Sequence, residues 1–294
     1  MTGALGTLLL FALTPVFANR AAQRLGSLPA NFWRLLVAAV GLGAWAHSFG
    51  RGWGGGAFGW FFAGGVVGFG IGGVAMFQSL PRLGSALSTL IVQCAAAVVA
   101  AGTEWLWLGT SLSGPQLLCA TATLAGVVIG LLPQSLPRVS PLAWRAGLAW
   151  ALLSAVGQGV GAVMSRRAFL AAAGQQERID PGSAAYQRAL GGLLIAALAW
   201  WLAAKRGDGG IARRPGRAWP WVGANALTGP VLGVTCYQWA LRTMSAGVVQ
   251  PMVAAAPLLT IPFAAWLEGT RPRATYYVGA VLAVAGVGGL MVWR

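Results

Sequence analysis

Long apolar runs, broken by short polar or glycine-rich stretches, make up almost the whole chain. Ten of these runs are about 17–25 residues long, which is the length that an α-helix needs to cross a bilayer. They cover residues 3–19, 31–48, 57–79, 84–108, 114–132, 142–166, 183–204, 219–240, 245–267 and 274–293. We therefore predict an all-α polytopic membrane protein with ten transmembrane helices.

One block of the sequence occurs twice, 160 positions apart. Residues from about 73 to 131 align without a gap with residues from about 233 to 291. The identical pairs include Gln78 with Gln238, Arg82 with Arg242, Ser85 with Ser245, and Gly126 with Gly286. Repetition at a fixed offset is the signature of a duplicated structural unit.

The duplication divides the chain into two halves of five predicted spans each. Residues 1–132 form the first repeat, the proline-containing stretch 133–141 is a linker, and residues 142–294 form the second repeat. Because an odd number of spans makes the second copy enter from the opposite side, the repeats are expected to be inverted. Inverted repeats are an architecture of secondary transporters, with the substrate site between the halves near the bilayer midplane.

Composition agrees with this interpretation and limits the alternatives. The chain is 57% hydrophobic and only 9% charged, whereas a soluble domain carries about 25% charged residues. The net charge of +15 comes from arginines that stand mainly in turns and at span ends, where they anchor helices to lipid headgroups. Nucleic-acid binding is therefore not expected. The distribution of basic residues over the predicted loops places both termini outside by the positive-inside rule.

The chain is poorly supplied with catalytic and metal-binding side chains. It has a single histidine, five carboxylates and three cysteines. Cys94, Cys119 and Cys236 all fall inside apolar runs without metal-ligand spacing, so they are expected to act as packing residues. We predict no enzyme activity, no metal site and no cofactor. A membrane enzyme or lipid-handling protein remains the alternative from another functional class.

The glycines are dense at 64–73, within the third predicted span. Small residues allow helices to approach closely in a membrane. Tight packing is the favoured interpretation, and a helix that bends or slides during gating is the alternative.

Short motifs recur in both copies of the block. The second copy has Ala-Leu-Arg at 240–242, Ser-Ala at 245–246, Pro257, and Gly279 with Gly286; the first has Leu-Pro-Arg at 80–82, Ser-Ala at 85–86, and Gly126. In these motifs the chain resembles the drug/metabolite transporter superfamily, in particular the ten-helix exporters of the EamA type. Arg34 and Arg188 resemble the arginine that this family carries early in the second span of each repeat.

The chain also departs from the family pattern. Thr110 and Thr270 stand where the family has glutamate, Ala97 stands at the position of a proline, and Cys119 stands at that of a glycine. The resemblance implies a multi-pass protein of the bacterial inner membrane that exports amino acids, related metabolites or drugs by alternating access, without a cofactor. The implied partners are a small-molecule substrate and the lipid bilayer. The oligomeric state stays open, a monomer included.

Amide side chains inside the apolar runs are the first candidates for a binding site, because polar groups in a membrane are costly. Gln93 and Gln158 lie near the centres of the runs 84–108 and 142–166. We predict that they face a central cavity and contact substrate, since an amide both donates and accepts hydrogen bonds. Hydrogen bonding between helices is the alternative. Asn19, at the end of the first run, is a further candidate.

Gln78 and Gln238 are repeat mates at span ends, which also fits a structural role at a helix end. Tyr237 and Trp239 flank Gln238 and are candidates for aromatic cavity walls that suit a cation or an aromatic side chain. For most tryptophans of the chain, an interfacial belt is the simpler explanation.

Charged groups within the spans are few. Arg34 and Arg188 lie one turn into their runs, where snorkelling or pairing with a helix end is favoured over binding a substrate carboxylate. Glu104 is the one carboxylate predicted inside a span. Because no Asp, Glu or His lies at a span centre, proton exchange is not expected.

The sequence thus predicts an exporter or exchanger of a small metabolite, such as an amino acid or similar zwitterion, with a central cavity between two repeats. The alternative within transport is an organic-cation or drug transporter that uses aromatic cation–π contacts and Glu104.

Overall fold

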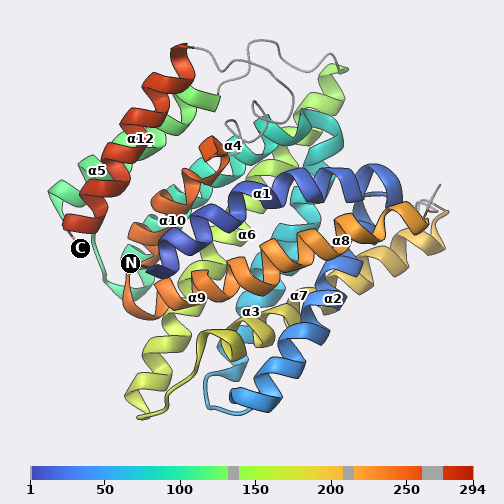
Figure 1. The fold of residues 1–294 in the computed structure, drawn as a ribbon, viewed down its shortest axis with the longest axis horizontal. Coiled ribbons are helices and arrows are strands. Elements are labelled where there is room, and N and C mark those ends of the chain that lie inside the picture. Colours follow the sequence, from blue (N-terminus) through green and yellow to red (C-terminus); the bar gives the residue numbers. More distant parts are fainter. Residues whose placement is uncertain (1, 132–138, 208–214, 260–273, 294) are drawn as a thin grey trace.

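The computed structural model describes residues 2–131, 139–207, 215–259 and 274–293. Within these ranges all regular structure is helical (Figure 1). The elements are α1 (Thr2–Leu25), α2 (Ser27–Phe49), α3 (Phe58–Gly65), η1 (Val66–Ile71), α4 (Gly72–Leu108), α5 (Gly114–Leu131), α6 (Pro141–Gly174), α7 (Pro181–Lys205), η2 (Pro215–Arg217), α8 (Trp219–Ala226), η3 (Leu227–Val231), α9 (Leu232–Thr243), α10 (Ala246–Ala254) and α12 (Ala274–Val292).

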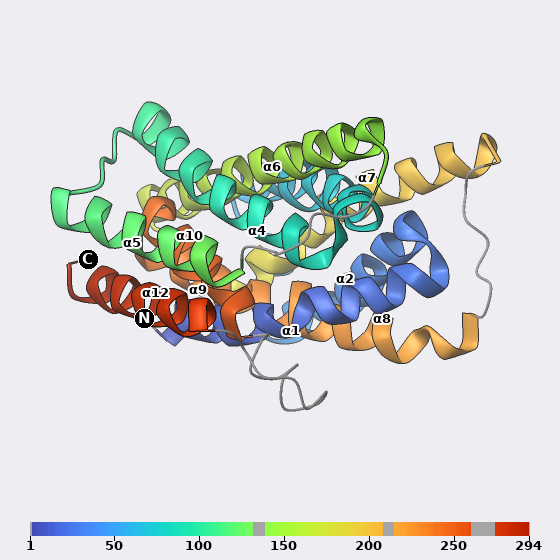
Figure 2. The same cartoon turned by 90° about the horizontal axis from the view of Figure 1, so that it is seen from above.

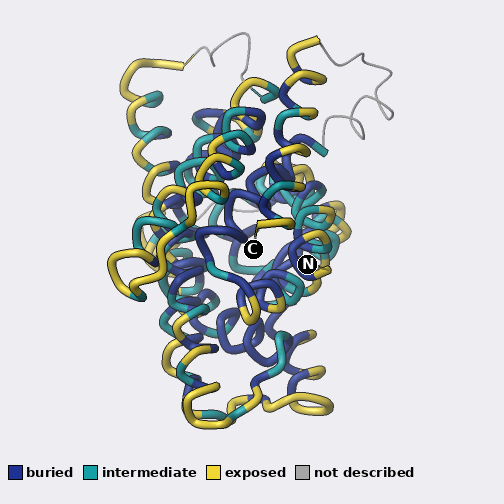
Figure 3. Tube along the Cα trace, turned by 90° about the vertical axis from the view of Figure 1, so that its left-hand side faces the viewer, coloured by how far each residue is buried: buried dark blue, intermediate teal, exposed yellow. Residues whose placement is uncertain are grey.

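Six helices of the described part are long and apolar enough to cross a membrane. They are Thr2–Leu25, Phe58–Leu108, Gly114–Leu131, Pro141–Gly174, Pro181–Lys205 and Ala274–Val292, and Ala246–Leu259 is a shorter apolar helix. Buried residues concentrate between the helices, while exposed ones follow the loops and the outer faces (Figure 3). These features agree with the predicted all-α polytopic membrane protein.

The helices differ from the predicted spans mainly in length. α1 and α6 continue beyond residues 19 and 166, where the predicted spans end, because a helix goes on past the bilayer as long as nothing interrupts it. The predicted span 219–240 is divided into α8, η3 and α9. The predicted span 245–267 starts as α10, but its part after residue 259 lies outside the described residues, as does most of the predicted linker 133–141.

The predicted spans 57–79 and 84–108 form one helical run that is bent at Gly84. The run Phe58–Leu108 has 51 residues. At 1.5 Å per residue a straight helix of that length would measure about 76 Å, more than twice the bilayer core. Gly84 has φ 78° and ψ 165°, which is not helical and which only glycine adopts readily. The bend divides the run into two stretches that are each long enough to cross once.

Some pairs of helices that the 160-residue offset makes equivalent pack against each other, and other contacts join non-equivalent helices of the two halves. α5 lies alongside α12 at one edge of the molecule (Figures 1 and 2), and α2 packs against α7. α1 contacts α9, and α6 contacts α3, η1 and α4. The centre of the molecule is therefore enclosed by helices from both halves of the chain.

Two π-helical segments interrupt the helices at matching sequence positions. Adding 160 to the bounds of η1 gives 226–231, and η3 covers Leu227–Val231. In η3, Pro230 has no N–H to donate, so the regular hydrogen-bond ladder cannot continue through it. Segments of this kind inside α-helices are frequent at functional sites.

Glycines mark the closest helix crossings. A Cβ on Gly126 of α5 would lie 2.5 Å from the carbonyl oxygen of Gly279 on α12. A Cβ on Gly286 would lie 2.6 Å from the carbonyl oxygen of Cys119. Because backbone atoms cannot rotate away, only glycine fits at these positions. In the glycine-rich stretch 64–73, Cβ atoms on Gly65 and Gly70 would likewise overlap α7, which bears out the tight-packing interpretation.

Candidate substrate cavity

A cavity lies at the centre of the molecule and is lined by residues of α1, α2, η1, α4, α6, α7, α8, η3, α9 and α10. The volume open to the centres of water-sized spheres is about 150 Å³. One water needs about 10–15 Å³ by this measure, so the cavity has room for roughly ten waters or a small metabolite. α5 and α12 contribute no lining residue, which agrees with their position at the edge.

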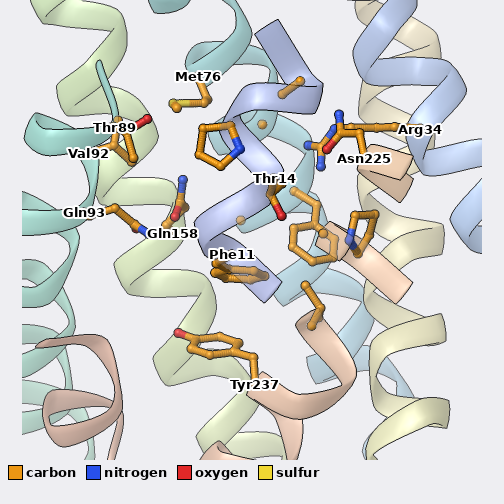
Figure 4. Close-up of a pocket in the computed structure, with 18 of the residues that line it drawn as sticks. Phe11, Thr14, Arg34, Met76, Thr89, Val92, Gln93, Gln158, Asn225 and Tyr237 are labelled. Atoms are coloured by element: carbon orange, nitrogen blue, oxygen red, sulfur yellow. The ribbon is translucent and has the colours of Figure 1, made fainter. Parts of the chain in front are cut away.

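Gln93 and Gln158 both lie on the cavity wall (Figure 4). Gln93 comes from α4 and Gln158 from α6, which pack against each other. Both side chains are half-buried, and Gln158 Nε2 donates a hydrogen bond to Ser154 Oγ at 3.3 Å. The wall formed by α4 and α6 is therefore polar but neutral at these positions.

Tyr237 also lines the cavity, and its hydroxyl is engaged by the protein. The hydroxyl donates to Oε1 of Gln250, another cavity residue, at 2.6 Å. Phe11 of α1 lies beside the ring, with a centroid distance of 6.3 Å. Phe69 and Phe77 add further aromatic surface to the cavity.

Gln238 and Trp239, the neighbours of Tyr237, do not line the cavity. Gln238 is fully buried and its Nε2 donates to Ser165 Oγ at 3.3 Å. Trp239 is 44% exposed on the outer surface. Successive residues of a helix point about 100° apart, so three neighbours cannot share one face.

Gln78 and Asn19 lie outside the cavity lining as well. Gln78 Oε1 accepts a hydrogen bond from Arg82 Nη1 at 3.1 Å. Gln78 thus orients the arginine that lies one turn further along the same helix. Asn19 is half-buried on α1. For Gln78, the alternative of a structural role agrees with this contact, although Gln78 lies inside α4 and not at a helix end.

Glu104 is buried, with 2% of its surface exposed, but it does not line the cavity. Its Oε2 accepts a hydrogen bond from the backbone N–H of Gly247 at 2.7 Å. Gly247 belongs to the first turn of α10, and Ser245 at the start of that helix makes no side-chain cap. Glu104 thus supplies the missing cap from α4, where a carboxylate also interacts favourably with the helix dipole.

We expect Glu104→Gln to leave the response of transport to a pH gradient unchanged, because the amide oxygen of glutamine still accepts the Gly247 N–H. Glu104→Leu removes the acceptor and should lower the melting temperature of the purified protein. Transport with and without a pH gradient, together with thermal unfolding, checks both variants. If Glu104→Gln abolished transport driven by a pH gradient, Glu104 would be a coupling group and not a cap.

Arg34 and Arg188, for which the sequence favoured a role at a helix end, both line the cavity. Arg34 Nε donates to Asn31 Oδ1 at 3.0 Å, and its Cζ lies 5.1 Å from the centroid of the Phe77 ring. Arg188 Nη1 donates to the carbonyl oxygen of Gly161 at 2.7 Å and to Ser165 Oγ. One sequence signal could have indicated that both arginines line the cavity: they occupy equivalent positions, one turn into the second span of each half.

Asn225 of α8 is a further cavity residue; the sequence marks it as a polar side chain inside the predicted span 219–240 but did not place it in the candidate site. It is fully buried, and neither its Nδ2 nor its Oδ1 has a hydrogen-bond partner among the described residues. Nothing in an isolated apolar run distinguishes such an asparagine from one that bonds to a neighbouring helix.

The charge balance of the cavity is positive. Two arginines and no Asp or Glu stand among the lining residues of the described part. A buried charge without a partner costs free energy, so an anionic group on a ligand would be favoured here and a cation would be repelled.

Comparison with known proteins adds a family and a fold. The model of the EamA-like transporter family matches residues 1–132 and 145–292. A crystal structure described only as that of a protein is similar with a TM-score of 0.77 at 17% sequence identity, over 99% of this chain and 95% of the other. At this identity the likeness concerns the fold alone. No curated protein matches the chain.

Proposed function

Because the chain belongs to the EamA-like transporter family, within the drug/metabolite transporter superfamily, we propose that it exports or exchanges a small metabolite through its central cavity. The observation that carries the proposal is the cavity itself, which is lined by side chains from both halves of the chain and has room for a molecule of roughly ten non-hydrogen atoms. In this proposal the protein lies in the inner (cytoplasmic) membrane of a bacterium.

The proposed mechanism is alternating access between two inverted five-helix repeats, residues 1–132 and 142–294. The equivalent positions of η1 and η3 support the duplication, and so does the packing of α2 on α7 and of α5 on α12. Both π segments contribute lining residues, Gly68 in η1 and Gly229 in η3. Local rearrangement there would open or close the cavity without unfolding a helix.

The proposed substrate is an amino acid or a similar zwitterion. Arg34 and Arg188 make the cavity positive, which favours a substrate with a carboxylate, and Gln93 and Gln158 provide neutral hydrogen-bonding groups. The organic-cation alternative receives less support, because its expected anionic partner, Glu104, caps α10 and does not line the cavity. The family is one of transporters, so we propose no enzymatic role.

Counterflow in proteoliposomes tests the proposal. We expect vesicles preloaded with mixed amino acids to take up a labelled amino acid, and vesicles preloaded with choline to take up no labelled choline. The Gln158→Leu variant should transport less, because it removes a polar group from the cavity wall. Gln78→Leu is the matched control outside the cavity and should transport like the wild type. Exchange of choline in place of amino acids would contradict the proposed substrate class.

A further inference from the structure

We propose that Arg34 and Asn225, supported by Asn31, form the subsite that binds the carboxylate of the substrate. The inference rests on the proposed transport function and assigns the orientation of the substrate in the cavity. The first observation is the state of the Arg34 side chain. Its Nε is held by Asn31 Oδ1 at 3.0 Å, and its Cζ lies 5.1 Å from the Phe77 ring centroid. The guanidinium is therefore fixed in place.

The two terminal nitrogens of Arg34 have no hydrogen-bond partner among the described residues, although the residue lines the cavity. Gly73 leaves the space that one of them occupies, since a Cβ there would lie 3.3 Å from Arg34 Nη2. A guanidinium presents its N–H groups as a planar fork that matches the two oxygens of a carboxylate. Arg34 is thus oriented for such a group but has none in the protein.

The second observation is Asn225, whose side chain lies at the same side of the cavity as that of Arg34 (Figure 4). α8, which carries Asn225, packs against α2, which carries Arg34. Asn225 is 0% exposed, and both its Nδ2 and its Oδ1 lack a partner in the described structure. Buried amides in folded proteins are almost always hydrogen-bonded, so an amide with neither atom paired within the described protein leaves both atoms available to a ligand in the cavity.

The neighbouring Asn31 points to the same conclusion. Its Oδ1 is used by Arg34, but its Nδ2 is buried and has no partner. The unpaired groups of the three side chains are the terminal nitrogens of Arg34, the Nδ2 atoms of Asn31 and Asn225, and the Oδ1 of Asn225. All of them are donors except this Oδ1. A carboxylate accepts from the donors, and a nearby ammonium or hydroxyl of the same substrate can donate to Asn225.

The equivalent arginine of the second half is not free in the same way. Arg188 Nη1 is bonded to the Gly161 carbonyl oxygen and to Ser165, so this nitrogen connects α7 to α6, while Arg188 Nε is buried without a partner in the described structure. The position equivalent to Asn225 is Gly65, and a Cβ there would already lie 2.0 Å from the Arg188 carbonyl oxygen. An asparagine cannot stand at that position. The carboxylate subsite is therefore single, and the substrate binds in one orientation.

The opposite wall indicates which part of the substrate faces it. Gln93 and Gln158 stand on α4 and α6, across the cavity from Arg34 and Asn225 in Figure 4. They are neutral, so they can accept any polar group of suitable size. The structure therefore makes the carboxylate the group that is recognised, while the rest of the molecule is selected less strictly. The substrate class is that of small organic acids, amino acids included, with a free carboxylate.

The test compares amino acids with their carboxamides, which have nearly the same shape but no carboxylate. Each of a set of L-amino acids and its carboxamide competes for counterflow of a labelled amino acid. We expect the wild type to prefer the acid by about tenfold or more. Arg34→Gln should reduce this preference to near one. Asn225→Asp should do the same without a change in size, because the new carboxylate neutralises Arg34 and repels that of the substrate.

Gln78→Glu, which adds a carboxylate outside the cavity, is the matched control and should keep the wild-type preference. Size-exclusion profiles and melting temperatures show whether each variant is folded. Equal competition by acids and carboxamides in the wild type, or an unchanged preference in folded Arg34→Gln and Asn225→Asp, would overturn the subsite while transport, and thus the proposed function, remains.

If no amino acid is transported, the proposed function fails and the subsite is tested by binding. Propionate should then raise the melting temperature of the wild type more than propionamide does, and this difference should vanish in Asn225→Asp. The same shift for both compounds would overturn the subsite too.

Discussion

We expect Gly65→Val to prevent stable folding of the protein. A Cβ at position 65 would lie 2.0 Å from the carbonyl oxygen of Arg188, and the reciprocal Cβ on Gly191 would lie 2.1 Å from that of Phe62. Both overlaps are with backbone atoms, which no side-chain rotation relieves. α3 would have to move away from α7, and η1, which follows α3 and lines the cavity, would be displaced with it. Overpacking of a core typically costs about 1–3 kcal/mol, and more where backbone must move.

The measurement is thermal unfolding of the purified protein in detergent, together with the yield of monodisperse material. Gly59→Ala is the control in the same helix, because a Cβ there has no atom within 4 Å. It should be neutral or slightly stabilising, since alanine is the better helix former by about 1 kcal/mol. A similar melting temperature for Gly65→Val and the wild type would contradict the close contact between α3 and α7.

The second large effect is expected for Arg188→Ala. Its guanidinium bonds to the Gly161 carbonyl oxygen and to Ser165, and Ser165 also accepts from Gln238. Truncation leaves a void at the junction of α6, α7 and α9 and breaks a buried hydrogen-bond network. We expect a loss of about 2–5 kcal/mol of folding free energy, as for other large-to-alanine changes in a core, and a loss of transport with it.

Two further variants separate the contribution of the lost side-chain volume from that of the lost hydrogen bonds. Arg188→Met keeps most of the volume and removes the desolvation cost of the charge, so it should lose less stability than Arg188→Ala. Arg34→Ala, the equivalent change in the first half, should lower the melting temperature less than Arg188→Ala, since the described hydrogen bond of Arg34 runs from Nε to Asn31 of the same helix and connects no second helix. Equal destabilisation by Arg34→Ala and Arg188→Ala would contradict the asymmetry of the two halves.

The candidate site shows what a single sequence reveals about a membrane cavity. Gln93 and Gln158 were predicted to face a cavity and they line it, as does Tyr237. Whether they bind substrate remains a prediction. Gln78, Gln238, Asn19, Trp239 and Glu104 were grouped with them and lie elsewhere. The reason is that helices in a membrane are apolar toward lipid as well as toward their neighbours. No hydrophobic face then marks the direction of the core.

The arginines illustrate the same limit more sharply. Arg34 and Arg188 occupy equivalent positions, and the sequence favoured a helix-end role for both. In the fold, Arg188 Nη1 is bonded to α6, whereas the described hydrogen bond of the Arg34 side chain runs to Asn31 of its own helix, beside an unpaired Asn225. The difference depends on residues distant in the sequence, Gly161 and Ser165 for Arg188 and Phe77 for Arg34, as well as on Asn31 in the helix of Arg34 itself.

The sequence by itself determined the membrane-protein class, the approximate position of most helices, the 160-residue repetition and the resemblance to a transporter family. These properties depend on short segments or on comparing the sequence with itself. The length of an apolar segment decides whether it can span a bilayer, and an internal repeat is visible in the sequence alone. Only the tertiary structure decided where the helices bend, which faces enclose the cavity, and which polar groups stay unpaired. Those features depend on packing between distant segments, where one glycine, such as Gly65, admits a neighbour that any side chain would exclude.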